Sequence, residues 1–283
     1  HKPVYLEEKA PLKFKLLSPE NIHWAKSDQD IEPQKMRERI EPWLTALFQS
    51  EHLSLLVGAG LTNAVHQLAT ESLPNSMSKI EFNVFKDQIE KAAPESAESA
   101  GRSYGNIEDQ IRVANELLKG LEHYCVTDLG EFEQLKEQKT QLKKDIDEVL
   151  TNFSKSILQS ENKIAQSRDD TRSKAFGYLV NFLMSFASRT GTRDRLQIFT
   201  TNYDRIIESG AEIAGLHLID RFVGNLNPIF RSSRLNIDMH YDPPGIRGEP
   251  RYLEGVAKFT KLHGSLDWIH TNGEIRKIGL PFG

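Results

Sequence analysis

Three short blocks of this sequence carry residue types that could perform chemistry on a nucleotide. The first is the glycine turn at residues 58–60, and the others run from Thr200 to Asp204 and from Lys261 to Ser265. An apolar run that predicts a buried strand leads into each block. Because open α/β sheets bind ligands at the carboxyl ends of their strands, we expect the three blocks to meet at one edge of a sheet.

The glycine turn has the arrangement of a phosphate-binding loop. Residues 53–57 form its predicted strand, and a predicted helix follows it. Gly58 and Gly60 would let the backbone approach a phosphate, and Ala59 is small enough not to intrude. The backbone N–H groups around Leu61 and Thr62 would complete the cradle at the positive end of the helix dipole.

The three blocks together resemble the sirtuin superfamily, in which a Gly-Ala-Gly turn, a Thr-Gln-Asn-Ile-Asp block and a Leu-His-Gly-Ser block occur in this order. The sequences of the two later blocks, Thr-Thr-Asn-Tyr-Asp and Lys-Leu-His-Gly-Ser-Leu-Asp-Trp, look like those of the sirtuin-like domains of bacterial antiphage defence. Those domains hydrolyse NAD instead of deacylating lysine. The resemblance covers about residues 35 to 280 and implies a Rossmann-like parallel sheet with NAD as the substrate.

The resemblance also implies roles for individual residues. Cleavage of the nicotinamide–ribose bond needs a fixed pyrophosphate, a stabilised oxocarbenium-like ribose and a positioned base or water. Asn202 would hold a ribose hydroxyl or the attacking water, and His263 would be the general base, so these two are the expected catalytic residues. Asp204 would recognise the nicotinamide carboxamide or the ribose. The matched blocks add three further expected substrate contacts: Thr201, Gly264 and Ser265.

Structural roles compete with these chemical ones. Asn202 and Asp204 could cap a helix that begins near Arg205, and a histidine such as His263 is often a structural residue. Asp109 lies in an acidic helix start, Asn106 to Asp109, that also occurs in sirtuin-like defence domains; capping explains it too, but we retain Asp109 as a candidate substrate-binding residue.

The cysteine content argues against lysine deacylation. Cys125 is the only cysteine of the chain, so it can form neither an internal disulfide nor a four-cysteine zinc site. Deacylating sirtuins carry such a zinc ribbon shortly after the His-Gly block. We therefore expect no metal and no deacylase activity.

Composition places the chain among ordinary globular proteins. The 283 residues are 38% hydrophobic and 27% charged, which is enough for a large core. The net charge of −4 argues against direct nucleic-acid binding. No apolar run is long enough to span a membrane, and no export signal follows His1, so we expect a cytoplasmic protein without a membrane partner.

Hydrophobic periodicity predicts an α/β protein with a helical insertion subdomain. We expect an N-terminal arm at residues 1–33, a Rossmann-like catalytic core at 34–65 and 191–283, and the insertion at 66–190. An apolar stripe between Met36 and Phe48 predicts a helix packed on the sheet. The resemblance leads us to expect that the core is incomplete at its C-terminal end.

A helix of some 30 residues is predicted around the stretch from Phe132 to Leu158. Its apolar stripe has two interpretations: packing within the insertion, or contact with a partner or another copy of the chain. An unrestrained NAD hydrolase would harm its host. The resemblance thus implies control by homo-oligomerisation or by a partner such as a HerA-type ATPase or another defence-system sensor.

The resemblance therefore implies an NAD glycohydrolase that produces nicotinamide and ADP-ribose and depletes NAD in antiviral defence. Two alternatives remain open: a module that senses NAD or an ADP-ribose-related signal without consuming it, and a structural subunit of a defence complex. A sensor would not need the base His263.

Overall fold

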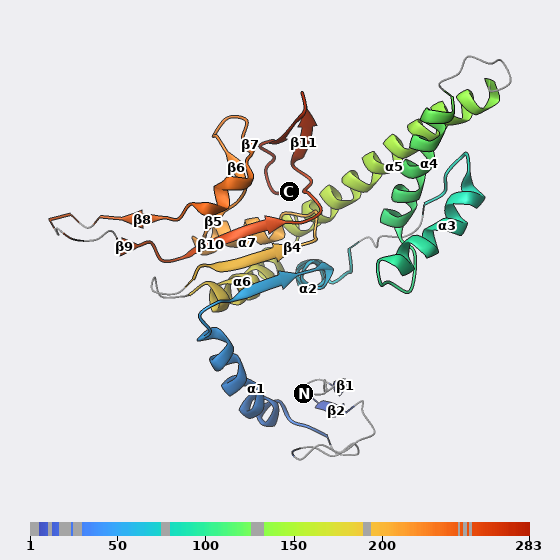
Figure 1. The fold of residues 1–283 in the computed structure, drawn as a ribbon. Coiled ribbons are helices and arrows are strands. Elements are labelled where there is room, and N and C mark those ends of the chain that lie inside the picture. Colours follow the sequence, from blue (N-terminus) through green and yellow to red (C-terminus); the bar gives the residue numbers. More distant parts are fainter. Residues whose placement is uncertain are drawn as a thin grey trace.

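The protein is a mixed α/β structure built on a four-stranded parallel sheet (Figure 1). The computed structural model describes residues 6–10, 13–16, 24, 30–74, 80–125, 133–188, 194–242, 244–245, 248 and 251–283. The strands of the central sheet, in spatial order, are β3 (Ser54–Val57), β4 (Leu196–Thr200), β10 (Val256–Lys261) and β5 (His217–Ile219).

The register of the central sheet aligns the ends of three strands. Val57 of β3 lies opposite Thr200 of β4, and Thr200 lies opposite Lys261 of β10. Since all the pairings are parallel, the residues that follow these three strands leave the sheet at the same edge and at the same level. The expected convergence of the three blocks is confirmed.

Three helices cover one face of this sheet: α2 (Ala59–Thr70), α6 (Asp169–Ala187) and α7 (Ile206–Ala214). The alternation of β3 explains why, because Leu55 and Val57 are buried whereas Leu56, on the other face, is 72% exposed. Helix α6 buries Phe176, Leu179 and Leu183 against the sheet. The arrangement is Rossmann-like.

Helices between β3 and β4 form a second core. They are α3 (Lys86–Ser99), α4 (Ile107–Tyr124) and the long α5 (Glu133–Ala165). Figure 1 shows α3, α4 and the beginning of α5 projecting away from the central sheet. The polar side chain of Asp145 supports this core: its carboxylate accepts hydrogen bonds from the backbone and side chain of Asn83 and from Gln141. Burial raises the pKa of Asp145, but these hydrogen bonds outweigh it and lower the pKa overall.

The expected helical insertion is thus present, with α4 and α5 close to their predicted positions. The end of α5 and the whole of α6, however, pack in the core of the sheet and not in that of the insertion. The domain boundaries stay a prediction, and the one at 190/191 lies outside the described residues, as do parts of the arm at 1–33.

Smaller strands complete the fold. A second sheet contains β6 (Phe222–Val223), β7 (Ile229–Phe230), β11 (Trp268–Thr271) and β12 (Glu274–Lys277), and a 3₁₀ helix covers Ser232–Asn236. Two pairs of strands stand apart, namely β1 (Leu6–Ala10) with β2 (Lys13–Leu16) and β8 (His240–Tyr241) with β9 (Arg251–Tyr252). A hairpin turn at Asn272-Gly273 joins the antiparallel strands β11 and β12.

The expected packing of the first helix on the sheet is wrong. Helix α1 (Pro33–Phe48) has no buried residue, and Trp43 is 62% exposed. Only its end reaches the core, where Phe48 packs edge to face on Phe186 with ring centroids 5.0 Å apart. Its apolar residues therefore recur with the helical period although the helix does not pack on the sheet.

Two glycines test the packing of α7 on α6. A methyl group at Gly210 would lie 2.6 Å from Leu179 Cδ2, whereas one at Gly177 would meet nothing within 4 Å. We expect Gly210→Ala to lower the free energy of unfolding by about 1 to 2 kcal/mol, because overpacking outweighs the gain in helix propensity. Gly177→Ala should raise it by up to about 1 kcal/mol. Urea denaturation measures both, and equal effects would contradict the close contact.

Candidate functional site

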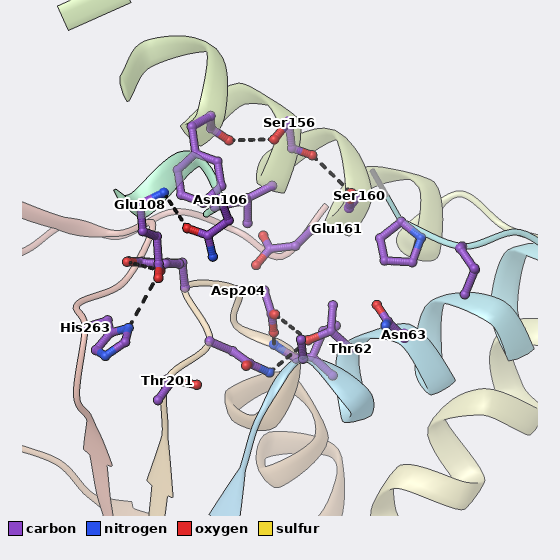
Figure 2. A pocket seen from close by; sticks show the side chains of 18 of the residues that line it. Thr62, Asn63, Asn106, Glu108, Ser156, Ser160, Glu161, Thr201, Asp204 and His263 are labelled. Carbon is purple, nitrogen blue, oxygen red and sulfur yellow. Dashed lines mark hydrogen bonds and ion pairs between the residues drawn. The ribbon is translucent and has the colours of Figure 1, made fainter. Parts of the chain in front are cut away.

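A cavity of about 830 Å³ lies at the carboxyl edge of the central sheet, between the ends of β3, β4 and β10 and the helices α4 and α5. Figure 2 shows Thr62, Thr201 and Asp204 on the sheet side and Ser156 and Ser160 on α5 across from them. Six of the residues expected to bind or convert substrate line this cavity: Ala59, Thr62, Thr201, Asn202, Asp204 and His263.

The other expected substrate contacts do not line the cavity. They are Gly58, Gly60, Leu61, Gly264, Ser265 and Asp109. Gly58 is the N-cap of α2, so the glycine turn does open a helix, and Ala59 and Thr62 of its first turn line the cavity. The N–H of Leu61, expected to contact a phosphate, donates to the carbonyl of Gly58 at 3.1 Å, so the earlier N–H groups of the turn are the ones that have no partner within the helix and suit an anion.

Asn202 is held by the glycine turn. Its Nδ2 donates to the carbonyl oxygen of Gly58 at 3.0 Å and to Thr62 Oγ1 at 2.9 Å. Both amide hydrogens are thereby committed, and Oδ1 accepts no hydrogen bond from the described residues. The side chain therefore keeps one oriented acceptor, and it does not cap α7.

Asp204 combines a structural contact with a place in the cavity lining. Its Oδ1 accepts a hydrogen bond from the backbone N–H of Ile206 at 3.1 Å, so the capping interpretation is confirmed for this residue. Its Oδ2 accepts from Thr62 Oγ1 at 2.6 Å. Thr62 thus joins Asp204 to Asn202, and the three side chains form one hydrogen-bonded unit across the ends of β3 and β4 (Figure 2).

Lys261 holds the backbone of this hydrogen-bonded unit in place. Its side chain is only 2% exposed, and Nζ donates to the backbone carbonyl of Asp204 at 2.5 Å and to Glu208 Oε1 at 2.9 Å. Burial raises the pKa of Glu208, although Lys261 acts in the opposite direction. The last residue of β10 thereby fixes the loop after β4.

The two loops after β4 and β10 are also tied by their backbones. The carbonyl of Tyr203 accepts hydrogen bonds from the N–H of Leu266 at 3.0 Å and from Ser265 Oγ at 3.4 Å. Gly264 has φ of +100°, a conformation that favours glycine, and this turn carries the chain back after His263. Gly264 and Ser265 therefore shape the loops while lying outside the cavity lining.

Glu108 is a functional candidate that sequence reasoning missed. Its Oε1 accepts a hydrogen bond from the Tyr203 hydroxyl at 2.9 Å and lies 3.8 Å from His263 Nδ1 (Figure 2). The His263 side chain is 46% exposed and lines the cavity. Burial, followed by the contact with Glu108, raises the pKa of Tyr203, so its hydroxyl stays a protonated donor at neutral pH.

Asp109, the acidic neighbour selected from the sequence, turns away from the cavity. It forms a capping box with Asn106: Asp109 Oδ2 accepts from the N–H of Asn106 at 2.9 Å, and Asn106 Oδ1 accepts from the N–H of Asp109. The side chain of Asp109 is 0% exposed. The signal for Glu108 was present in the same acidic helix start, one position earlier.

A buried ion pair forms part of the cavity wall. Arg205 Nη2 lies 2.5 Å from Glu161 Oε2, and the backbone N–H of Arg205 donates to Glu161 Oε1 at 2.7 Å. Arg205 also donates to the carbonyl oxygens of Leu280 and Pro281. Since Glu161 belongs to α5, this pair fastens the long helix to the loop that carries Asn202.

Comparisons with known proteins add no family assignment: no protein-family model matches the chain, and no curated protein matches it. Within the described ranges, no group of three or more His, Cys, Asp and Glu side chains is arranged to hold a metal ion. No helix in this part of the chain is long and apolar enough to cross a membrane.

We expect Glu161→Ala to lower the free energy of unfolding by about 3 to 5 kcal/mol, because it leaves the Arg205 guanidinium buried without its counter-charge. The matched control is Glu148→Ala on the exposed side of the same helix, which should change stability by less than about 0.5 kcal/mol. Chemical denaturation followed by circular dichroism measures both. Similar stabilities for the two variants would show that the ion pair does not hold the wall.

Proposed function

We propose that this chain is an NAD glycohydrolase that cleaves NAD to nicotinamide and ADP-ribose. One observation carries the proposal: Asn202, Asp204 and His263 come from two loops far apart in the sequence and line a single cavity together with the first turn of α2. The resemblance of these blocks to sirtuin-like domains supports NAD as the substrate.

The dimensions and polarity of the cavity suit a dinucleotide. A volume of about 830 Å³ lies within the range of small-molecule sites, and apolar side chains such as Phe153, Ile157 and Ile206 line it beside the polar ones. The first turn of α2 would receive a phosphate, as helix N-termini commonly do.

Each of the site residues would have a separate role in the hydrolysis. Water attacks the anomeric carbon of the ribose, the carbon–nitrogen bond breaks, and its electron pair leaves with nicotinamide. His263 takes the proton that the water loses and passes it to solvent, while Asn202 Oδ1 orients the water or a ribose hydroxyl. The Asp204 carboxylate favours the positive charge that develops on the sugar.

Glu108 would act as a positioning residue in this scheme. A carboxylate near His263 Nδ1 favours the ring orientation in which Nε2 is the base, and it stabilises the imidazolium that forms. Glu108 is itself held by Tyr203 and by the capped first turn of α4, so the helical insertion would complete the site.

The biological role follows from the same resemblance. NAD depletion in antiviral defence would take place in the cytoplasm and would require restraint. We propose that restraint comes from homo-oligomerisation or from a partner such as a HerA-type ATPase. The exposed stripe of α1 is a candidate for such a contact, in addition to the exposed side of α5.

Replacement of the two catalytic candidates tests the activity. We expect Asn202→Ala and His263→Ala each to reduce NAD consumption by roughly 100-fold or more, the usual effect of losing a positioned base or its water. The measurement is free nicotinamide released by the purified chain, with thermal unfolding as the control for folding. Saturable NAD binding without nicotinamide release by the wild type would favour a sensor, and unchanged rates in both variants would refute the assignment.

Glu108→Gln keeps the size of the side chain and removes its charge. We expect kcat to fall by roughly 10-fold or more, a part of the contribution of a general base, with little change in KM. The matched control is Glu116→Gln, two turns along the exposed side of α4, which should behave as wild type. A KM effect at unchanged kcat would mean that Glu108 binds substrate and does not position His263.

A further inference from the structure

The cavity has a cationic wall that the catalytic scheme does not use. Within the described part of the chain, the cavity is lined by two basic side chains, Arg102 and Arg112. Arg102 precedes α4 and Arg112 lies on it, so both belong to the helical insertion and not to the glycine turn. Neither residue belongs to the three sequence blocks.

The two guanidinium groups share a single buried counter-charge. Arg102 Nη2 donates to Asp109 Oδ1 at 2.5 Å, and Arg112 Nη1 lies 3.6 Å from the same oxygen. Asp109 is further occupied by Ser96 and by the backbone of Asn106. Within the described ranges, Asp109 is therefore the carboxylate that pairs with both guanidinium groups.

Glu108 is a second carboxylate beside this wall, but in the described part of the chain it makes no hydrogen bond to either arginine. Glu108 Oε2 lies 4.0 Å from Arg102 Nη1, beyond hydrogen-bond distance, and the other oxygen of Glu108 is committed to Tyr203. Nε and Nη1 of Arg102, and Nε and Nη2 of Arg112, donate to no residue in the described ranges. Side-chain exposures of 33% for Arg102 and 46% for Arg112 leave these donors accessible from the cavity.

We propose that Arg102 and Arg112 form a diphosphate-binding site for the dinucleotide. Guanidinium groups bind phosphate oxygens through paired, charge-assisted hydrogen bonds, and two of them side by side match the successive phosphates of a diphosphate better than a single carboxylate. The remaining charged lining residues are carboxylates that are engaged with protein groups: Asp204 with Thr62, Glu161 with Arg205, and Glu108 with Tyr203.

Asp109 has a defined part in this site. Its bond to Arg102 and its proximity to Arg112 hold the two side chains beside each other before a ligand arrives, which reduces the entropy lost on binding. The proposal rests on the proposed function for the identity of the dinucleotide, but recognition of a diphosphate by the two arginines does not depend on catalysis.

Calorimetric titration of the full chain with inorganic pyrophosphate, ADP-ribose and nicotinamide tests the site. We expect Arg112→Met to weaken the binding of pyrophosphate and ADP-ribose by roughly 10-fold or more and to leave nicotinamide, which has no phosphate, unaffected. Arg112→Lys should retain part of the affinity, because the charge remains while the paired donors are lost. Lys119→Met, an exposed cation further along α4, is the matched control for net charge.

The outcomes separate this proposal from the hydrolase. Diphosphate binding that is equal in Arg112→Met and wild type, or that falls equally in Lys119→Met, would overturn the arginine site even if NAD is hydrolysed. Arg112-dependent binding of pyrophosphate by a wild-type chain that neither binds nor consumes NAD would support the site and overturn the hydrolase. Thermal unfolding confirms that each variant is folded, and Arg102→Lys, which keeps a cation beside Asp109, repeats the test at the second guanidinium.

Discussion

The buried guanidinium of Arg205 is the point at which the separate parts of this molecule are held together. It is paired with Glu161 of α5 and bonded to the carbonyl oxygens of Leu280 and Pro281. A charge removed from water is tolerated only when its partners are well placed, so these groups must keep their relative positions for the chain to fold. The loop with Asn202 to Asp204 ends directly at Arg205 and therefore inherits this constraint.

A second anchor, Lys261, fixes the same loop from the neighbouring strand. Because Arg205 and Lys261 hold the backbone on two sides, the small hydrogen-bonded unit of Asn202, Thr62 and Asp204 does not need to be rigid by itself. Side chains that act on a substrate need to be placed within about half an ångström, and buried contacts around them are the usual means. Here these buried contacts are made by two cations, Arg205 and Lys261, that take no part in the proposed reaction.

Local pattern predicted much of this architecture. The apolar run at residues 53–57, the cap at Asn106 and the long periodic stripe of α5 each predicted the local structure, and parallel pairing then brings the three blocks together. The exposure of Leu56 on the other face of β3 was not predicted. The position of α1 could not be predicted in this way, because amphipathic periodicity reports a face and not what covers it.

The sequence predicted the part of the candidate site that the loops after the strands supply, but not the part that α4 supplies. Glu108 and Asp109 are adjacent acidic residues, and the sequence does not state which of them turns toward His263 and which caps the helix. Successive helical residues point about 100° apart, so this depends on how α4 is rotated against the sheet. The same rotation brings Arg112 to the cavity, and only tertiary packing defines it.

Helix α5 spans both cores, and its length has a mechanical consequence. Leu142 and Ile146 are buried in the core of the insertion, whereas Glu161 and Ile164 are buried beside the sheet. At 1.5 Å per residue, Leu142 lies roughly 28 Å along the axis from Glu161. A tilt of about 5° about the Glu161 end would thus move Leu142 by about 2.5 Å, so a small change of angle at the cavity wall corresponds to a larger displacement of the distal insertion.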